Sequence, residues 1–276
     1  MTSSNVPEAS NTSGFTISSV QELNALPKSM REALYLRLIP EEIFARFRID
    51  RESLKGPLGH EAVRMAAFEG KPWARVEVRA TPVDRDPLLM VDLSTSPFAV
   101  PELTFVQITD PISERFGIDR TEDGQDTLFG SVSRNLPEEL RSLQAGLAPG
   151  QVRRGLRLLG RVLECMEEFC RLLGVDLFLV EPLFYHSAII YERHGCGYFF
   201  GRELMDEIHE GFAPGGALAV KLDGSSPFRQ PGCEATVRGR SWAIHDGILE
   251  RPWGEVKMFK AVGSHANIAT FPGGVY

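Results

Sequence analysis

The sequence lacks long hydrophobic runs and any excess of basic residues. No apolar stretch approaches the roughly 20 residues that a membrane-spanning helix needs, so we expect no membrane association. The net charge of −7, from 30 basic and 37 acidic residues, argues against general nucleic-acid binding, which requires a basic surface. The N-terminus also lacks the basic-then-apolar layout of a secretion signal, and we therefore expect a cytoplasmic protein.

Cysteine and histidine are sparse, and neither shows a metal-binding spacing. The four cysteines form no C-x-x-C pair, which predicts buried, reduced thiols in place of a disulfide framework. His186 and His194 have no carboxylate or cysteine at a recognisable ligand spacing, so no metal is predicted. A metal enzyme using His186, His209, His245 or His265 is a distant alternative.

The composition is that of an ordinary globular protein, with 43% hydrophobic and 24% charged residues in a chain of 276. Residues 1–13 are small and polar, which predicts a disordered tail. We expect one domain over 14–222, interrupted by an insertion at 110–148. The Gly- and Pro-rich segment 223–276 is predicted to be an extension packed on that domain. The sequence does not indicate an oligomeric state.

The chain is organised around residues 149–200. Apolar residues spaced three or four apart predict a long helix over 151–173, and Gly174 suits its C-terminal end. The apolar run 177–180 predicts a buried strand, and a short helix over 187–194 and a strand over 198–200 follow. This alternation is typical of an α/β unit.

Patterns outside this unit predict the remaining elements. Strands are expected at 15–20, 74–80, 88–93, 103–108, 128–132, 217–222 and 256–260. Helices are expected at 28–38, 41–48, 60–69, 137–145 and 203–212. The fold class is therefore α/β (α+β), with an antiparallel meander leading into the parallel unit.

Four arginines crowd the first half of the predicted long helix: Arg153, Arg154, Arg157 and Arg161. Arginine at a helix start opposes the helix dipole, so helix stability does not explain their position. An anion bound at the free N–H groups would explain it. The alternative is a solvated basic face balanced by glutamates further along the helix.

Two stretches of this unit resemble the GNAT (acyl-CoA N-acyltransferase) superfamily. The first is the arginine–glycine turn Gln151-Val152-Arg153-Arg154-Gly155 opening a long helix, and the second is the stretch from Ser187 to Cys196. The second stretch, SAIIYERHGC, is close to the superfamily pattern A-x-x-x-Y-E-x-x-G-F. The resemblance implies a mixed central sheet flanked by helices, with an insertion before the long helix and a C-terminal extension.

The resemblance also implies a function and a set of site residues. Acyl-CoA (acetyl-CoA) would be the co-substrate, with its pyrophosphate at the helix start formed by Gln151, Arg153, Arg154 and Gly155. The acceptor would be a small-molecule amine or another, unknown group. Tyr191 would protonate the departing thiolate, and Glu181 is the candidate base for the attacking amine.

Departures from the pattern leave a second hypothesis open. The superfamily loop has glycine or alanine three and five residues after its first arginine or glutamine; counted from Arg154, these positions hold Arg157 and Leu159. The alternative is a protein of this fold without transferase activity, acting as a ligand-binding or structural module. In the tail, residues 239–247 place His245 and Asp246 beside Trp242 and Ser241, either as a site or, as we favour, as a packed turn.

Overall fold

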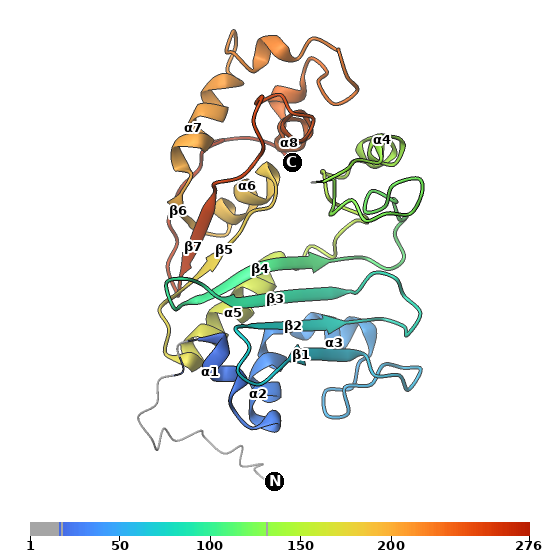
Figure 1. Cartoon of the computed structure of the whole chain (residues 1–276), viewed down its shortest axis with the longest axis vertical. Coiled ribbons are helices and arrows are strands. Elements are labelled where there is room, and N and C mark those ends of the chain that lie inside the picture. Colours follow the sequence, from blue (N-terminus) through green and yellow to red (C-terminus); the bar gives the residue numbers. More distant parts are fainter. Residues whose placement is uncertain (1–16, 18, 131) are drawn as a thin grey trace.

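A single mixed sheet of seven strands runs through the molecule in the computed structural model, which describes residues 17, 19–130 and 132–276 (Figure 1). The strands are β1 Val63–Ala67, β2 Trp73–Val78, β3 Leu89–Thr95, β4 Pro101–Ile108, β5 Leu177–Val180, β6 Gly197–Phe200 and β7 Lys257–Ala261. Their order in the sheet is β1-β2-β3-β4-β5-β7-β6.

The pairing of these strands is antiparallel except at one place. β1 to β4 form an antiparallel meander, and β7 lies antiparallel between β5 and β6. β4 and β5 are parallel, and they pair over two positions only, Glu102 with Leu179 and Leu103 with Val180. The predicted antiparallel meander is confirmed. Of the predicted parallel unit, only the pairing of β5 with β4 is parallel, because β7 lies between β5 and β6.

Apart from α4 (Leu136–Gln144), the helices gather at two places around the sheet (Figure 1). They are α1 Val20–Asn24, α2 Lys28–Tyr35, α3 Glu41–Phe47, α4 Leu136–Gln144, α5 Leu159–Leu173, α6 Tyr185–Arg193, α7 Arg202–Gly211 and α8 Val237–His245, with 3-10 turns at Leu36–Leu38, Ala219–Lys221 and Cys233–Ala235. Figure 1 shows α1, α2, α3 and α5 together beside β1–β4, and α6, α7 and α8 at the end of the sheet formed by β5–β7. In the part of the chain that the structure describes, no helix combines the length and the apolar character needed to cross a membrane.

The long helix α5 packs through one apolar face. Val162, Met166, Phe169 and Leu173 recur at three or four residues and are all buried. The ring of Phe169 stacks on Tyr35 at the end of α2, with 6.0 Å between the ring centroids. This contact holds the N-terminal helices against the central α/β unit.

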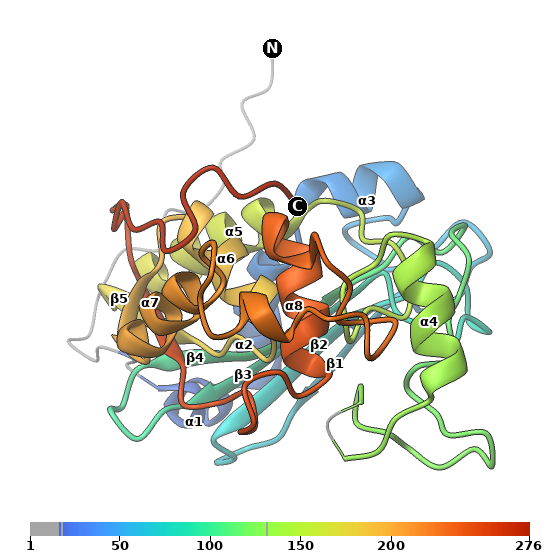
Figure 2. The same cartoon turned by 90° about the horizontal axis from the view of Figure 1, so that it is seen from above.

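Helix α8 joins the insertion to the rest of the molecule. Figure 2 shows α8 between α4 on one side and α6 and α7 on the other. His245 of α8 lies 3.1 Å from the buried carboxylate of Glu139 in α4, and Arg134 pairs with both Glu139 and Asp246. Trp242 is fully buried and donates its indole N–H to the carbonyl of Leu147 at 2.8 Å. The insertion is therefore fixed to the C-terminal segment by buried ionic and aromatic contacts.

Two predicted elements have the wrong type. Residues 60–69 were predicted as helix, but Val63–Ala67 is β1, which pairs along its length with β2. A short apolar run is compatible with the spacing of a helix or of a strand. Pairing with the free edge of β2 makes this segment a strand. Residues 217–222 were predicted as a strand, but they hold the 3-10 turn Ala219–Lys221 because the sheet position beside β5 is filled by β7.

Two further predictions differ from the structure, and two others fall mostly or wholly outside the described residues. Of the predicted strand 128–132, the described residues 128–130 and 132 form no strand; Leu128 and Phe129 have φ of 48° and 57°, a left-handed backbone. The predicted strand 15–20 and the predicted tail 1–13 lie mostly or wholly outside the described residues, and Val20 begins α1. Segment 223–276, predicted as a packed extension, supplies β7 to the interior of the sheet.

Lys257, the first residue of β7, joins the two parallel strands where their pairing ends. Its ammonium donates to Glu102 on β4 and, at 2.9 Å, to Glu181 directly after β5. Burial alone lowers the pKa of Lys257, but the hydrogen bonds to both carboxylates raise it above its ordinary value. Glu102 is only 5% exposed, so Lys257 supplies the counter-charge to a buried carboxylate.

We expect K257M to lower the free energy of unfolding by about 3 kcal/mol, because it leaves the buried Glu102 carboxylate without a counter-charge. Urea unfolding measures this change. The double variant E102Q/K257M removes both charges and should regain most of the lost stability. A K257M protein with the wild-type unfolding midpoint would show that the ion pair does not hold this part of the sheet.

Candidate functional site

A cavity of about 1140 Å³ opens where β4 and β5 separate. β4 continues beyond Leu103 as residues 104–108 without a partner on this side, and those residues form one wall. The opposite wall comes from α6, and the segment 145–161 leads from the insertion to α5 along a third side. Ligands in α/β sheets bind at such carboxyl ends of diverging strands, so this cavity is the candidate site.

The start of α5 presents open N–H groups to the cavity. The helix begins at Leu159, eight residues later than the predicted start at Gln151. The carbonyl of Leu158 accepts the first intrahelical bond from Val162 at 2.9 Å, and Leu158 provides no side-chain cap. Among the described residues, none accepts a hydrogen bond from the N–H groups of Leu159, Gly160 or Arg161, and all three residues line the cavity.

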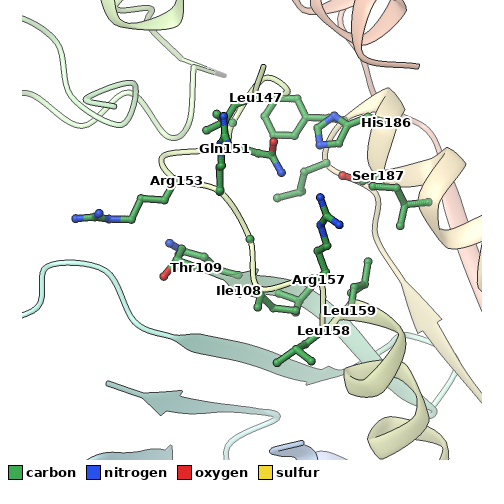
Figure 3. Close-up of a pocket in the computed structure, with 18 of the residues that line it drawn as sticks. Ile108, Thr109, Leu147, Gln151, Arg153, Arg157, Leu158, Leu159, His186 and Ser187 are labelled. Carbon is green, nitrogen blue, oxygen red and sulfur yellow. The ribbon is translucent and has the colours of Figure 1, made fainter. Parts of the chain in front are cut away.

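The four predicted cofactor-binding residues line the cavity but precede the helix. Gln151 folds back on its own loop and accepts a hydrogen bond from the N–H of Ala148 at 2.8 Å. Arg153 pairs with the half-buried Asp86 at 2.8 Å, and Figure 3 shows its guanidinium pointing away from His186 and Ser187.

Arg154 and Gly155 lie further along the same loop. Arg154 donates to the carbonyl of Ala145 at 3.2 Å, and a Cβ on Gly155 would lie 3.1 Å from the carbonyl oxygen of Ile108. The predicted arginine–glycine turn is thus a loop held against neighbouring segments and does not open the helix.

The arginine that extends into the cavity is Arg157, which was not among the predicted site residues. Figure 3 shows its side chain reaching from the start of α5 toward Ser187 and His186. Arg157 is exposed, and no described residue forms an ion pair or hydrogen bond with it. Its φ of 62° is unfavourable for a residue with a Cβ, and such strain gathers at functional positions.

The remaining arginine of the original four, Arg161, has partners. It pairs with Glu42 at 2.6 Å and also with Glu164. Arg161 therefore belongs to a solvated face balanced by glutamates, and Arg153 forms a structural ion pair. Arg157 is the arginine that fits an anion site. The sequence signal that could have identified Arg157 is its position three residues before Gly160, the spacing of the superfamily loop.

Tyr191 lies on the cavity wall from α6. Its ring is 4% exposed and belongs to the hydrophobic core, yet the residue lines the cavity and its hydroxyl has no hydrogen-bond partner among the described residues. Burial raises the pKa of this phenol well above its ordinary value. The hydroxyl therefore stays protonated at neutral pH and can act as a donor.

Glu181 also lines the cavity, but its carboxylate is engaged. One oxygen accepts from Lys257 at 2.9 Å, and 43% of the side chain is exposed. The structure brings Glu181 and Tyr191 into the same cavity.

His186 occupies the end of α6 farthest from the start of α5. Its Nδ1 lies 2.9 Å from the Oγ of Ser241, and its ring stacks on Phe184 at 5.6 Å between ring centroids. Burial lowers the pKa of His186 to about 3, with a smaller contribution from His245. The ring is therefore neutral at physiological pH. In the described part of the chain, no three His, Cys, Asp or Glu side chains converge on a possible metal position.

The stretch 239–247 is part of a helix and not the turn that we favoured. Residues up to His245 form α8, and Asp246 follows as the C-terminal cap. The Asp246 carboxylate accepts from Arg134, Ser226 and Arg229. Ser241 orients His186, and the rest of the stretch fixes α8 to the insertion.

Comparison of this chain with protein-family models, with curated proteins and with solved structures found no match.

The buried His186 predicts a pH dependence of stability. Its pKa in the folded protein lies below that of the unfolded chain, so the unfolded state binds more protons between about pH 6.5 and 3. Protonation of this histidine therefore favours the unfolded state. The free energy of unfolding falls as the pH decreases below 6.5, by up to about 1.4 kcal/mol per pH unit from this group. H186Q should unfold in urea with a smaller loss between pH 7 and 5, while the exposed control H265Q should keep the wild-type slope. Equal slopes for H186Q and wild type would contradict this.

Proposed function

We propose that this protein is an acyl-CoA-dependent N-acyltransferase that works in the cavity between β4 and β5. One observation carries the proposal: three open N–H groups at the start of α5 and Arg157, which pairs with no described residue, line the same cavity as Tyr191, whose phenol stays protonated. The first two features suit a phosphate-bearing ligand, and the third suits proton transfer beside it.

The arrangement of elements supports a GNAT-like fold. The antiparallel strands β1–β4, the long helix α5, the strand β5 and the short helix α6 follow one another as the resemblance implies. The observed helix start also changes the register of the superfamily loop. Counted from Arg157, the residue three positions on is Gly160, as the pattern requires, whereas the fifth is Val162.

Gly160 has a physical reason to be glycine. A Cβ at this position would lie 2.8 Å from the imidazole of His194, at the last turn of α6. The missing side chain lets the end of α6 approach the start of α5, and the three N–H groups there are left uncovered. A pyrophosphate held at this point would have the Arg157 guanidinium beside it.

Tyr191 and Glu181 would take the two proton-transfer roles. When the amine attacks the thioester carbonyl, the C–S bond breaks and Tyr191 supplies a proton to the departing thiolate sulfur. Because Lys257 engages Glu181, we propose that Glu181 accepts the proton of the amine through water and not directly. The competing proposal is a ligand-binding protein of the same fold, for which Val162 in place of a small residue is the supporting observation.

Acetyl-CoA should raise the melting temperature of the protein, since a ligand at one hundred times its Kd stabilises by about 2.7 kcal/mol. R157Q should weaken this binding by about 10- to 100-fold, the loss of one charge-assisted hydrogen-bond pair. R251Q removes a distant surface arginine that pairs with Glu207 and serves as the matched control. No shift with acetyl-CoA or longer acyl-CoAs at millimolar concentration would favour the non-catalytic alternative.

Y191F should lower kcat for thiol release from acetyl-CoA by about 10²-fold or more, because the general acid is lost. Its affinity for acetyl-CoA should stay unchanged. Y185F is the control: Tyr185 is buried on the same helix but does not line the cavity. Unchanged turnover in Y191F would remove the tyrosine from the mechanism while leaving CoA binding untouched.

A further inference from the structure

We propose that Arg238, together with Arg154, forms a second anion site that binds a carboxylate or phosphate carried by the acceptor amine. This inference rests on the proposed function, and it adds the chemical class of the acceptor. The site lies at the end of the cavity formed by the insertion and the C-terminal segment.

Arg238 has no counter-charge among the described residues. It is the second residue of α8 and lines the cavity, and its Nε is buried without a hydrogen-bond partner. Its guanidinium carbon stands 5.6 Å from the centroid of the Tyr276 ring, and no carboxylate of the described chain pairs with it. A partly buried charge without a partner is costly, and a guanidinium is suited to bind an oxyanion through two parallel hydrogen bonds.

A second arginine reaches the same turn. Arg154 donates to the carbonyl of Ala145 at 3.2 Å, and a Cβ on Gly146 would lie 3.0 Å from Nη1 of Arg238. Gly146 has a φ of 82°, so both its backbone and the space beside it require glycine. Two cations thus converge on the end of α4. The carbonyl groups at the end of α4 offset part of this positive charge. None of them accepts a hydrogen bond from the Nε of Arg238.

The position along α6 assigns this site to the acceptor and not to CoA. His194, near one end of α6, touches Gly160 at the proposed phosphate site. His186, at the other end, lies with its ring centroid 6.3 Å from that of Tyr276, which in turn contacts Arg238. Tyr191 stands between them, about 4.5 Å along the helix from His194 and about 7.5 Å from His186.

The N–H groups at Gly160 and the Arg238 guanidinium therefore lie toward opposite ends of α6, with the proposed acid between them, and the Arg157 side chain reaches from the first toward Ser187 (Figure 3). If a thioester sulfur lies at Tyr191 and its phosphates lie at Gly160, the space toward Arg238 is left for the second substrate. An acceptor that combines an amine with a carboxylate or a phosphate would place its anionic group on Arg238 and its nitrogen toward the thioester. Neutral amines would lack this contact.

Matched pairs of acceptors test the site by release of CoA thiol from acetyl-CoA. The pairs are phosphoethanolamine with ethanolamine and an amino acid with its carboxamide. The wild type should prefer the anionic member, and R238Q should lower kcat/KM for that member by about 10- to 100-fold. The neutral member and the KM for acetyl-CoA should change by less than about twofold. R238K should lie between the two, since it keeps the charge but not the two-pronged geometry.

Two results in this assay would overturn the site: an equal loss for both members of a pair, or a raised KM for acetyl-CoA in R238Q. The second result would assign Arg238 to the phosphates of CoA. R251Q controls for the loss of one positive charge, and circular dichroism with melting temperature verifies the folding of each variant.

If no acceptor is acetylated, equilibrium binding separates the site from the proposed function. Phosphoethanolamine and inorganic phosphate are then titrated in thermal shift with wild type, R238Q and R157Q. Stabilisation that is lost in R238Q and kept in R157Q supports an anion site at Arg238 even though transfer has failed. No stabilisation of the wild type, or equal stabilisation of R238Q, overturns it.

Discussion

The short parallel pairing of β4 and β5 is the constraint on which the rest of the molecule depends. Two residue pairs join these strands before they separate, and the ammonium of Lys257 holds Glu102 and Glu181 together at that point. Beyond it, the backbone of β4 faces open space in place of a neighbouring strand. A longer pairing would close the sheet and remove the cavity, whereas a missing pairing would leave α5 and α6 without a common support.

A second set of contacts builds the far end of the cavity. Glu139 is 2% exposed and is shared by Arg134 and His245, so the insertion cannot shift relative to α8 without exposing or isolating a buried charge. Trp242 fixes the same boundary through the carbonyl of Leu147. These contacts bring Gly146 of one segment to Arg238 of another. The chemistry of this end of the cavity is therefore a product of tertiary packing between parts of the chain far apart in sequence.

The sequence predicted elements well where local patterns were unambiguous. The continuous apolar run at 177–180 is a strand buried on both faces. The alternation at 74–80 is a strand with one buried face. The start of α5 was misplaced because Leu156 continues the apolar spacing of the helix into the preceding loop. That loop is extended since Val152 and Arg154 accept hydrogen bonds from Phe116 and Asp110, contacts that no local pattern encodes. The insertion of β7 between β5 and β6 is a long-range pairing of the same kind.

The candidate site shows how the position of a predicted residue depends on the end of its helix. An anion site needs free N–H groups at a helix start and a nearby cation, and both requirements move with the start of the helix. When α5 begins at Leu159, the cation in reach becomes Arg157, and Arg153 is left to pair with Asp86. Tyr191 kept its predicted place because α6 is short and bounded by Pro182 and Gly195, so its register could shift little. The position of a site residue can thus be predicted from sequence when residues such as proline and glycine mark the ends of the helix or strand that carries it.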